Sequence, residues 1–285
     1  AAPVQDTRPM ALQRGTQLDG RLRAAPSHHM AIQANPFEDV WRAPALGGID
    51  LATGVYAVQE VDIALPAEGF SWVVARTYNA RQETSGGSHR NSDGVQGANW
   101  FQSSQPTIAL YDDATDSKDM VYLAYGADRF AEYKRVYDPL LGVGSTYKGV
   151  NGAAGVFLYA AGAGSEPDTY TLTDQNGNEH VFFGFDADAG AAPGRLWKIT
   201  DPDGNVAYVG HSSTASSAIS SGFDGSGRMT TAYDTSGRRY TYTYSTLDSV
   251  TRLTQVKAEK NTGSWVMVAQ VDYGYYTSES YGDPG

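Results

Sequence analysis

The chain has 285 residues, of which 41% are hydrophobic and 19% are charged, so it is long enough to bury a core and too apolar to be disordered throughout. Its net charge of −11 argues against binding to nucleic-acid phosphates and to anionic membrane surfaces. The sequence has no cysteine, which excludes disulfides and thiolate chemistry, and no run of 18 apolar residues that could insert into a membrane as a helix. The 32 Gly and 19 Tyr favour a β-rich fold, because Gly weakens helices and Tyr prefers strands.

Residues 1–45 are rich in Pro, Gln, Ala and Arg and lack a long apolar alternation. We expect this segment to be an extended arm or linker. Its Phe37, Val40 and Trp41 are candidates for anchoring the arm to a neighbouring surface.

A β-rich entry domain is predicted over residues 46–167. "GVYAVQEVDIALP" alternates with period two, which predicts a strand with Val61 and Ile63 on its buried face. "FSWVVARTY" predicts a second strand that pairs with the first. The polar, Gly-rich residues 83–99 are typical of a long mobile loop.

Further strands are expected in the second half of this domain. "WFQSSQPTIALYDD" predicts a strand, and "MVYLAY" and "RFAEYKRVY" predict a paired set. "GVGSTYKGVNGAAG" (142–155) and "AAGAGSEPD" are interpreted as flexible corners, because Gly clusters usually interrupt strands. The acidic turn "DDATDSKD" (112–119) is interpreted as a solvated loop rather than a cation site.

Residues 168–285 are predicted to form hairpin repeats. "YTLTDQNGNEHVFFGF", "GRLWKITDPDGNVAYVGH" and "GRMTTAYDTSGRRYTYTYS" share one outline, in which Asp174, Asp201 and Asp234 mark corners 27 and 33 residues apart. Each Asp is followed three residues later by a Gly, which predicts a type I turn with Gly in the left-handed conformation that closes two antiparallel strands. In "RRYTYTYS", the tyrosines at 240, 242 and 244 are expected on one face.

These repeats resemble the RHS/YD-repeat family, whose outline runs from Gly-Arg-Leu through Asp-x-x-Gly to Tyr. "GIDLATGVYAVQEVDIALPAEGFSWVVARTYNAR" (48–81) resembles the entry segment that often precedes such arrays. The resemblance implies antiparallel β-hairpins in a curved sheet, and a large exported or cell-surface protein whose hairpins form a hollow shell around a toxin. Since about three repeats cannot enclose a cargo, we expect a part of a longer protein or a short relative with another role.

The sequence predicts no catalytic, cofactor-binding or metal-ligating residues. The five histidines (His28, His29, His89, His180 and His211) fit no metal or catalytic spacing, and no serine-hydrolase elbow or nucleotide-binding glycine loop occurs. Asp201-x-Asp203-x-Asn205 resembles the opening of a calcium loop, but the later bidentate Glu is missing. A glycosidase needs only two neighbouring carboxylates, so the 32 acids leave that activity open as a lesser alternative.

The predicted function is a non-enzymatic structural or scaffold module of a secreted or surface bacterial protein, without a cofactor. Its predicted partners are proteins or further copies, which it contacts through the N-terminal arm and through sheet edges. The alternative is a carbohydrate-binding adhesin that uses exposed aromatic side chains, with Trp72, Trp100, Trp197 and Trp265 as candidates, although most of these rings are expected in the core.

Overall fold

The computed structural model describes residues 45–46, 49–50, 56–67, 69–79, 95–97, 100–102, 105–112, 119–125, 130–138, 142–211 and 214–275. The predicted arm, apart from its last residue, and most of the predicted loop at 83–99 lie outside these residues, as do His28, His29 and His89.

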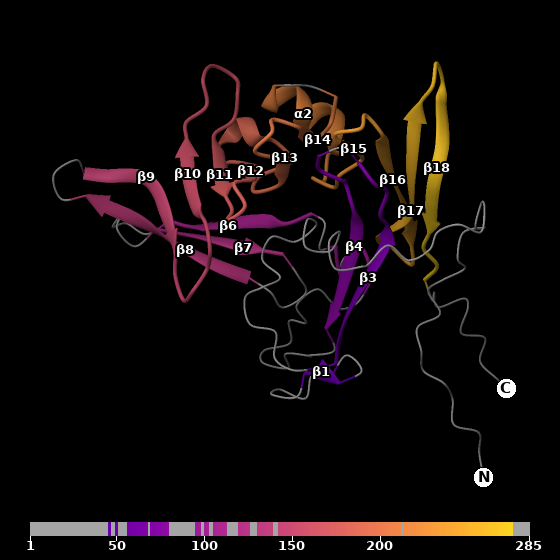
Figure 1. The fold of residues 1–285 in the computed structure, drawn as a ribbon, viewed down its shortest axis with the longest axis horizontal. Helices are drawn as coiled ribbons and strands as arrows, with labels where there is room; N and C mark the ends of the chain where they lie inside the picture. The colour runs from indigo at the N-terminus through magenta and orange to yellow at the C-terminus, as the bar shows by residue number, and fades with distance from the viewer. Residues whose placement is uncertain are drawn as a thin grey trace, which may run out of the picture.

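The described chain is mainly β, as predicted, and its strands are antiparallel (Figure 1). A two-stranded sheet pairs β1 (Ala45–Leu46) with β2 (Ile49–Asp50). A three-stranded sheet contains β3 (Ala57–Ile63), β4 (Val74–Asn79) and β5 (Trp100–Phe101). The large sheet contains thirteen strands: β6 (Thr107–Tyr111), β7 (Met120–Ala124), β8 (Phe130–Asp138), β9 (Gly142–Gly149), β10 (Val156–Ala160), β11 (Thr169–Thr173), β12 (Glu179–Phe183), β13 (Leu196–Thr200), β14 (Val206–Val209), β15 (Thr231–Tyr233), β16 (Arg239–Leu247), β17 (Val250–Asn261) and β18 (Trp265–Asp272).

In the large sheet, the strands follow one another in sequence order, and each pairs with its sequence neighbours in the sheet, so that β6 and β18 form its two ends. The sheet bends back on itself between β6 and β13, because Thr107 forms an antiparallel bridge with Arg195 and the Ile108 amide donates to the Gly194 carbonyl at 2.8 Å. The sheet is therefore curved, as predicted. It also runs across the boundary predicted between residues 167 and 168, since β10 pairs with β11 over five residues.

One face of the curved sheet carries the core. Aromatic and aliphatic side chains alternate inward on successive strands, so that each layer packs on the next. Tyr133 on β8 meets Phe157 on β10 edge to face at 4.8 Å, and Phe157 meets Phe182 on β12 at 5.8 Å. In β16, Tyr240 and Tyr242 are buried and Tyr244 is half-buried, which confirms the predicted tyrosine face.

The three-stranded sheet and its flanking residues pack against the C-terminal strands. The Trp72 indole donates to the Tyr242 hydroxyl at 2.9 Å, and the Thr235 hydroxyl donates to the Phe70 carbonyl at 2.9 Å. The Tyr273 hydroxyl, just after β18, donates to an oxygen of the Asp62 carboxylate at 2.8 Å. These contacts join residues more than 160 positions apart in the sequence.

Three local expectations need correction. Val61 is 48% exposed although Ile63 is 4% exposed, because a β-bulge at Asp62 changes the alternation and turns the Asp62 side chain to the buried Arg76. Residues 142–149 form β9 rather than a corner, because backbone pairing with β8 and β10 needs no side chains. Residues 215–222, for which no element was predicted, form helix α2 (Ala215–Gly222).

The helical segments are short. A single turn of 3₁₀ helix, η3 (Ala187–Ala189), precedes β13, and α2 lies between β14 and β15. In the described part of the chain, no helix has the length and apolar content that a membrane span requires.

Candidate functional site

The Asp-to-Gly corners have the predicted geometry. At Asp174, Asp201 and Asp234, the Asp carbonyl accepts the amide of the Gly three residues later at 3.0–3.1 Å. All three glycines have positive φ, from 72° to 85°. The corners connect β11 to β12, β13 to β14 and β15 to β16, so each of them closes a hairpin, as the sequence predicted.

A fourth corner of the same type, at Asp224, was not predicted. Its Oδ1 accepts the amides of Ser226 and Arg228 at 2.9 and 3.0 Å, and its Oδ2 accepts the Arg228 Nε at 2.6 Å. Gly227 has φ +70°. The corner joins Phe223 to Met229 through an isolated bridge rather than through a regular strand pair, so the flanking sequence lacks the alternation that marked the other corners.

The corner carboxylates are engaged by their own turns, which bears on the calcium interpretation. Asp201 accepts the Asn205 amide at Oδ1 and the Asn205 side-chain amide at Oδ2, each at 2.8 Å. Burial raises the pKa of Asp201, but these hydrogen bonds outweigh it and the pKa is lowered. Across the described residues, no group of three or more His, Asp and Glu side chains is arranged to hold a metal ion.

The acidic turn at 112–119 is only partly described, and its two described acids differ. Asp112 is exposed, in agreement with the solvated interpretation. Asp119 is 3% exposed and pairs with Arg135 on β8 at 2.8 Å, so the solvated interpretation is wrong for this residue. The pair joins the residue before β7 to the middle of the neighbouring strand β8 and is therefore structural.

The two described histidines contact single polar partners. His180 is buried on β12, and its Nε2 lies 3.4 Å from Oδ2 of Asp174, which is also buried. His211 is exposed, and its Nδ1 lies 2.5 Å from the Tyr233 hydroxyl. His180 therefore contacts the corner at Asp174, and His211 contacts the last residue of β15.

The four candidate tryptophans divide into two pairs. Trp72 and Trp197 are buried, and Trp197 stacks on Phe183 at 5.8 Å, so both belong to the core. Trp100 and Trp265 are half-buried, and a guanidinium lies over each ring: Arg76 at 4.4 Å and Arg239 at 4.2 Å respectively.

Buried carboxylates are the candidates for a glycosidase pair, and Asp62, Asp234 and Glu259 each have a basic partner. Asp62 pairs with Arg76 at 2.9 Å, and Glu259 pairs with Arg239 and Lys257 at 2.7 and 2.8 Å. Asp234 pairs with Arg238 at 2.6 Å. A catalytic acid needs a raised pKa. Burial raises the pKa of Glu259, but its hydrogen bonds with Lys257 and Arg239 outweigh this and lower it, so Glu259 is a poor proton donor.

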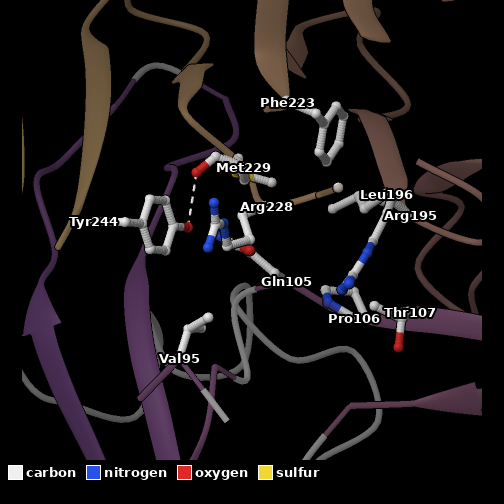
Figure 2. A pocket seen from close by; sticks show the side chains of 11 residues that line it. Val95, Gln105, Pro106, Thr107, Arg195, Leu196, Phe223, Arg228, Met229 and Tyr244 are labelled. Atoms are coloured by element: carbon white, nitrogen blue, oxygen red, sulfur yellow. Dashed lines mark hydrogen bonds between the residues drawn. The ribbon is translucent and has the colours of Figure 1, made fainter. Parts of the chain in front are cut away.

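A small pocket of about 80 Å³ lies where five segments of the chain meet (Figure 2). It is formed by Val95, by the chain leading into β6, by the start of β13, by the fourth corner, and by Tyr244 on β16. Its apolar wall includes Pro106, Leu196, Phe223 and Met229, and its polar side chains are Gln105, Thr107, Arg195, Arg228 and Tyr244. We call this the arginine pocket. No residue that lines it was predicted as a site.

The two arginines of this pocket differ in their partners. Arg228 pairs through Nε with Asp224, and its guanidinium carbon lies 5.3 Å from the Tyr244 ring centre. Arg195 is half-buried, and its side chain has no carboxylate partner among the described residues. Burial lowers the pKa of Arg195. The Tyr244 hydroxyl donates to the Met229 carbonyl at 2.8 Å, which orients that ring at the rim.

The sequence matches no protein-family model, and a search of curated proteins finds no significant match.

Proposed function

We propose that the protein is a non-enzymatic structural module of a secreted or surface bacterial protein of the RHS/YD-repeat type, which assembles with a second copy through an edge of its large sheet. The repeat outline in the sequence and the thirteen-strand meander with Asp-to-Gly corners support this proposal. The observation that carries the assembly is the last strand of the sheet, β18.

Strand β18 presents an apolar outer edge. In the described chain it pairs with β17 alone. Three consecutive residues, Val266, Met267 and Val268, are 48%, 52% and 45% exposed. A free strand edge with exposed apolar side chains is a template for pairing with another strand, and monomeric proteins usually protect such an edge with charges.

A second copy of β18 fits this edge. "WVMVAQVD" carries only one charge, that of Asp272 at its end. Antiparallel pairing of two copies places their two Asp272 side chains at opposite ends, so like charges do not face each other. The other end of the sheet is less open, because Thr107 and Ile108 of β6 already contact Gly194 and Arg195. Pairing of β18 with itself therefore gives a closed dimer rather than a fibre.

Sedimentation velocity over a range of protein concentrations tests this proposal. We expect a reversible monomer–dimer equilibrium that strengthens with added salt, because each copy carries a net charge of −11. Val268→Lys places a charge on the edge twice per dimer, so it should weaken dimerisation by at least about tenfold.

Leu158→Lys is the matched control. Leu158 is 50% exposed, but its strand β10 is paired on both edges. This variant loses the same kind of exposed side chain and should dimerise like the wild type. If the wild type stays monomeric at every concentration, the proposed assembly is refuted. If the two variants weaken dimerisation equally, the β18 edge is not the dimer interface. Deleting residues 1–45 tests the predicted arm contact separately.

Carbohydrate binding is a second candidate function, and a row of aromatic side chains favours it. Tyr208 stacks on Tyr233 with ring centres 5.2 Å apart and planes at 19°, and Tyr233 lies 6.2 Å from Trp265. Tyr208 and Trp265 are half-buried, so part of each ring reaches the surface. Rows of aromatic rings on a sheet are suited to stacking on sugars.

A glycan array distinguishes this candidate from the first. Binding that is lost in Trp265→Ala but retained in Tyr111→Ala would support it, because Tyr111 is 52% exposed on β6 at the far end of the sheet. An array without saturable binding by the wild type would argue against it.

A further inference from the structure

We propose that the arginine pocket binds a carboxylate group. The pocket is independent of the β18 edge, since its polar side chains come from the chain before β6, the start of β13, the fourth corner and β16. Three observations support the proposal: an uncompensated positive charge, an unsatisfied amide donor and the size of the cavity.

The first observation is the charge balance. Arg195 and Arg228 both line the pocket, whereas Asp224, the partner of Arg228, provides one negative charge nearby. Burial raises the pKa of the Tyr244 hydroxyl, and the charges of Arg228 and Arg195 both oppose this rise. Among the described residues this leaves one surplus positive charge. A half-buried guanidinium without a counter-ion is costly, and an anion would remove that cost.

The second observation is an amide that lacks an acceptor. The Nε2 of Gln105 is buried and forms no well-formed hydrogen bond among the described residues, although the Gln105 side chain lies near enough to the Tyr242 hydroxyl to oppose the rise in the pKa of Tyr242 that burial causes. Buried polar atoms are almost always hydrogen-bonded, so an orphaned donor indicates a missing acceptor. Figure 2 shows Arg195 and Arg228 entering the pocket from two sides near Gln105. An oxygen ligand placed there would accept from the amide and the guanidinium groups together.

The third observation is size and shape. A volume of about 80 Å³ has room for several water molecules, and a carboxylate group fits such a space. The planar fork of a guanidinium matches the two oxygens of a carboxylate, and a single surplus charge favours a monoanion over a phosphate dianion.

Nuclear magnetic resonance of the full chain labelled with ¹⁵N-arginine tests the proposal. Sodium acetate replaces sodium chloride at constant ionic strength, and the Nε–H signals of Arg195 and Arg228 are followed. We expect saturable shifts of both signals. Arg195→Met should weaken acetate binding at least about tenfold, which corresponds to the loss of a charged hydrogen bond. Arg195→Lys keeps the charge but loses the planar fork, and should weaken it less.

Lys148→Met is the matched control, because Lys148 is exposed on β9 and does not line the pocket. It removes the same charge and should leave acetate binding unchanged. A capped tripeptide with a central glutamate tests whether the carboxylate comes from a protein side chain: tighter binding than acetate assigns the pocket to a protein partner, and weaker binding assigns it to a small free acid.

Three results would overturn the proposal. Shifts that stay linear in acetate show no site, and equal shifts in Arg195→Met place any site elsewhere. Displacement of acetate by phosphate at lower concentration shows that the pocket prefers a different anion. Circular dichroism shows whether Arg195→Met is folded. If it is not, the wild-type acetate titration and its comparison with Arg195→Lys still decide whether the pocket binds a carboxylate.

Discussion

Replacing Asp234 by alanine should destabilise the fold far more than replacing Asp224, although the two residues occupy the same position in the same kind of corner. Each carboxylate accepts two backbone amides and one Arg Nε at 2.6 Å. Their environments differ. The Asp234 side chain is 0% exposed and also accepts the Tyr240 hydroxyl at 3.2 Å, whereas the Asp224 side chain is 25% exposed.

The expected magnitudes follow from burial. The Arg238 side chain is only 12% exposed, so Asp234→Ala leaves its guanidinium largely buried and without the carboxylate. The same substitution leaves the buried Tyr240 hydroxyl without its acceptor. Breaking a buried ion pair on one side costs about 3–5 kcal/mol, so we expect the free energy of unfolding to fall by about 4 kcal/mol. In Asp224→Ala water can replace part of the lost bonding, and we expect a loss of about 1–2 kcal/mol.

Equilibrium urea unfolding followed by tryptophan fluorescence measures both variants. The slope of the unfolding free energy against urea should stay unchanged, so that the shift in midpoint reports stability. Asp234→Asn, which keeps the acceptor for the two amides but loses the charge, should fall between the wild type and alanine. A loss in Asp224→Ala equal to or larger than that in Asp234→Ala would refute the reasoning that burial sets the cost.

Two further predictions concern a glycine and a buried acid. Gly194 has φ +67°, and an added Cβ would lie 2.2 Å from the Ile108 carbonyl oxygen, so Gly194→Ala should lower the free energy of unfolding by about 3 kcal/mol. Gly204 has φ +85° and open space around it, so Gly204→Ala should lower it by about 1 kcal/mol. Urea unfolding measures both variants, and equal losses would contradict the role of the close contact at Gly194. Burial raises the pKa of Asp174, but hydrogen bonds, first among them that with His180, outweigh it and lower the pKa. The folded state therefore binds this proton less tightly than the unfolded state, so the stability contributed by Asp174 is present above about pH 4 and is lost as the pH falls through the lowered pKa. The unfolding free energy should fall more steeply with acidification in the wild type than in Asp174→Asn, and parallel curves would contradict this.

The sequence predicted the features that depend on local chemistry. Asp, Gly and the residue after Gly are sufficient to define a corner, because the hydrogen bonds to backbone amides that shape the turn lie within five residues. The tyrosine face of β16 followed from strict alternation. The corner at Asp224 was missed because no regular strand pair flanks it. Strand β9 was missed because its glycines suggested a break, whereas its place in the sheet depends on backbone pairing with neighbours.

The arginine pocket could not be predicted from the sequence. Its polar residues lie between positions 105 and 244, and they meet because the sheet bends until β6 touches the chain before β13. Neither Arg195 nor Arg228 differs from a surface arginine in its local sequence. The bulge at Asp62 is a similar case, since its partner Arg76 lies on the neighbouring strand and Tyr273 lies 211 residues away.

That separation of 211 residues sets an order of events during synthesis. Strands β3 and β4 leave the ribosome before the surface that covers them, because that surface ends with Tyr273. At about 5–20 residues per second, the first hairpin waits roughly 10–40 s for its cover. Phe70 and Trp72 wait for a somewhat shorter span, because their partners Thr235 and Tyr242 emerge before Tyr273, and until then a chaperone can bind these apolar side chains.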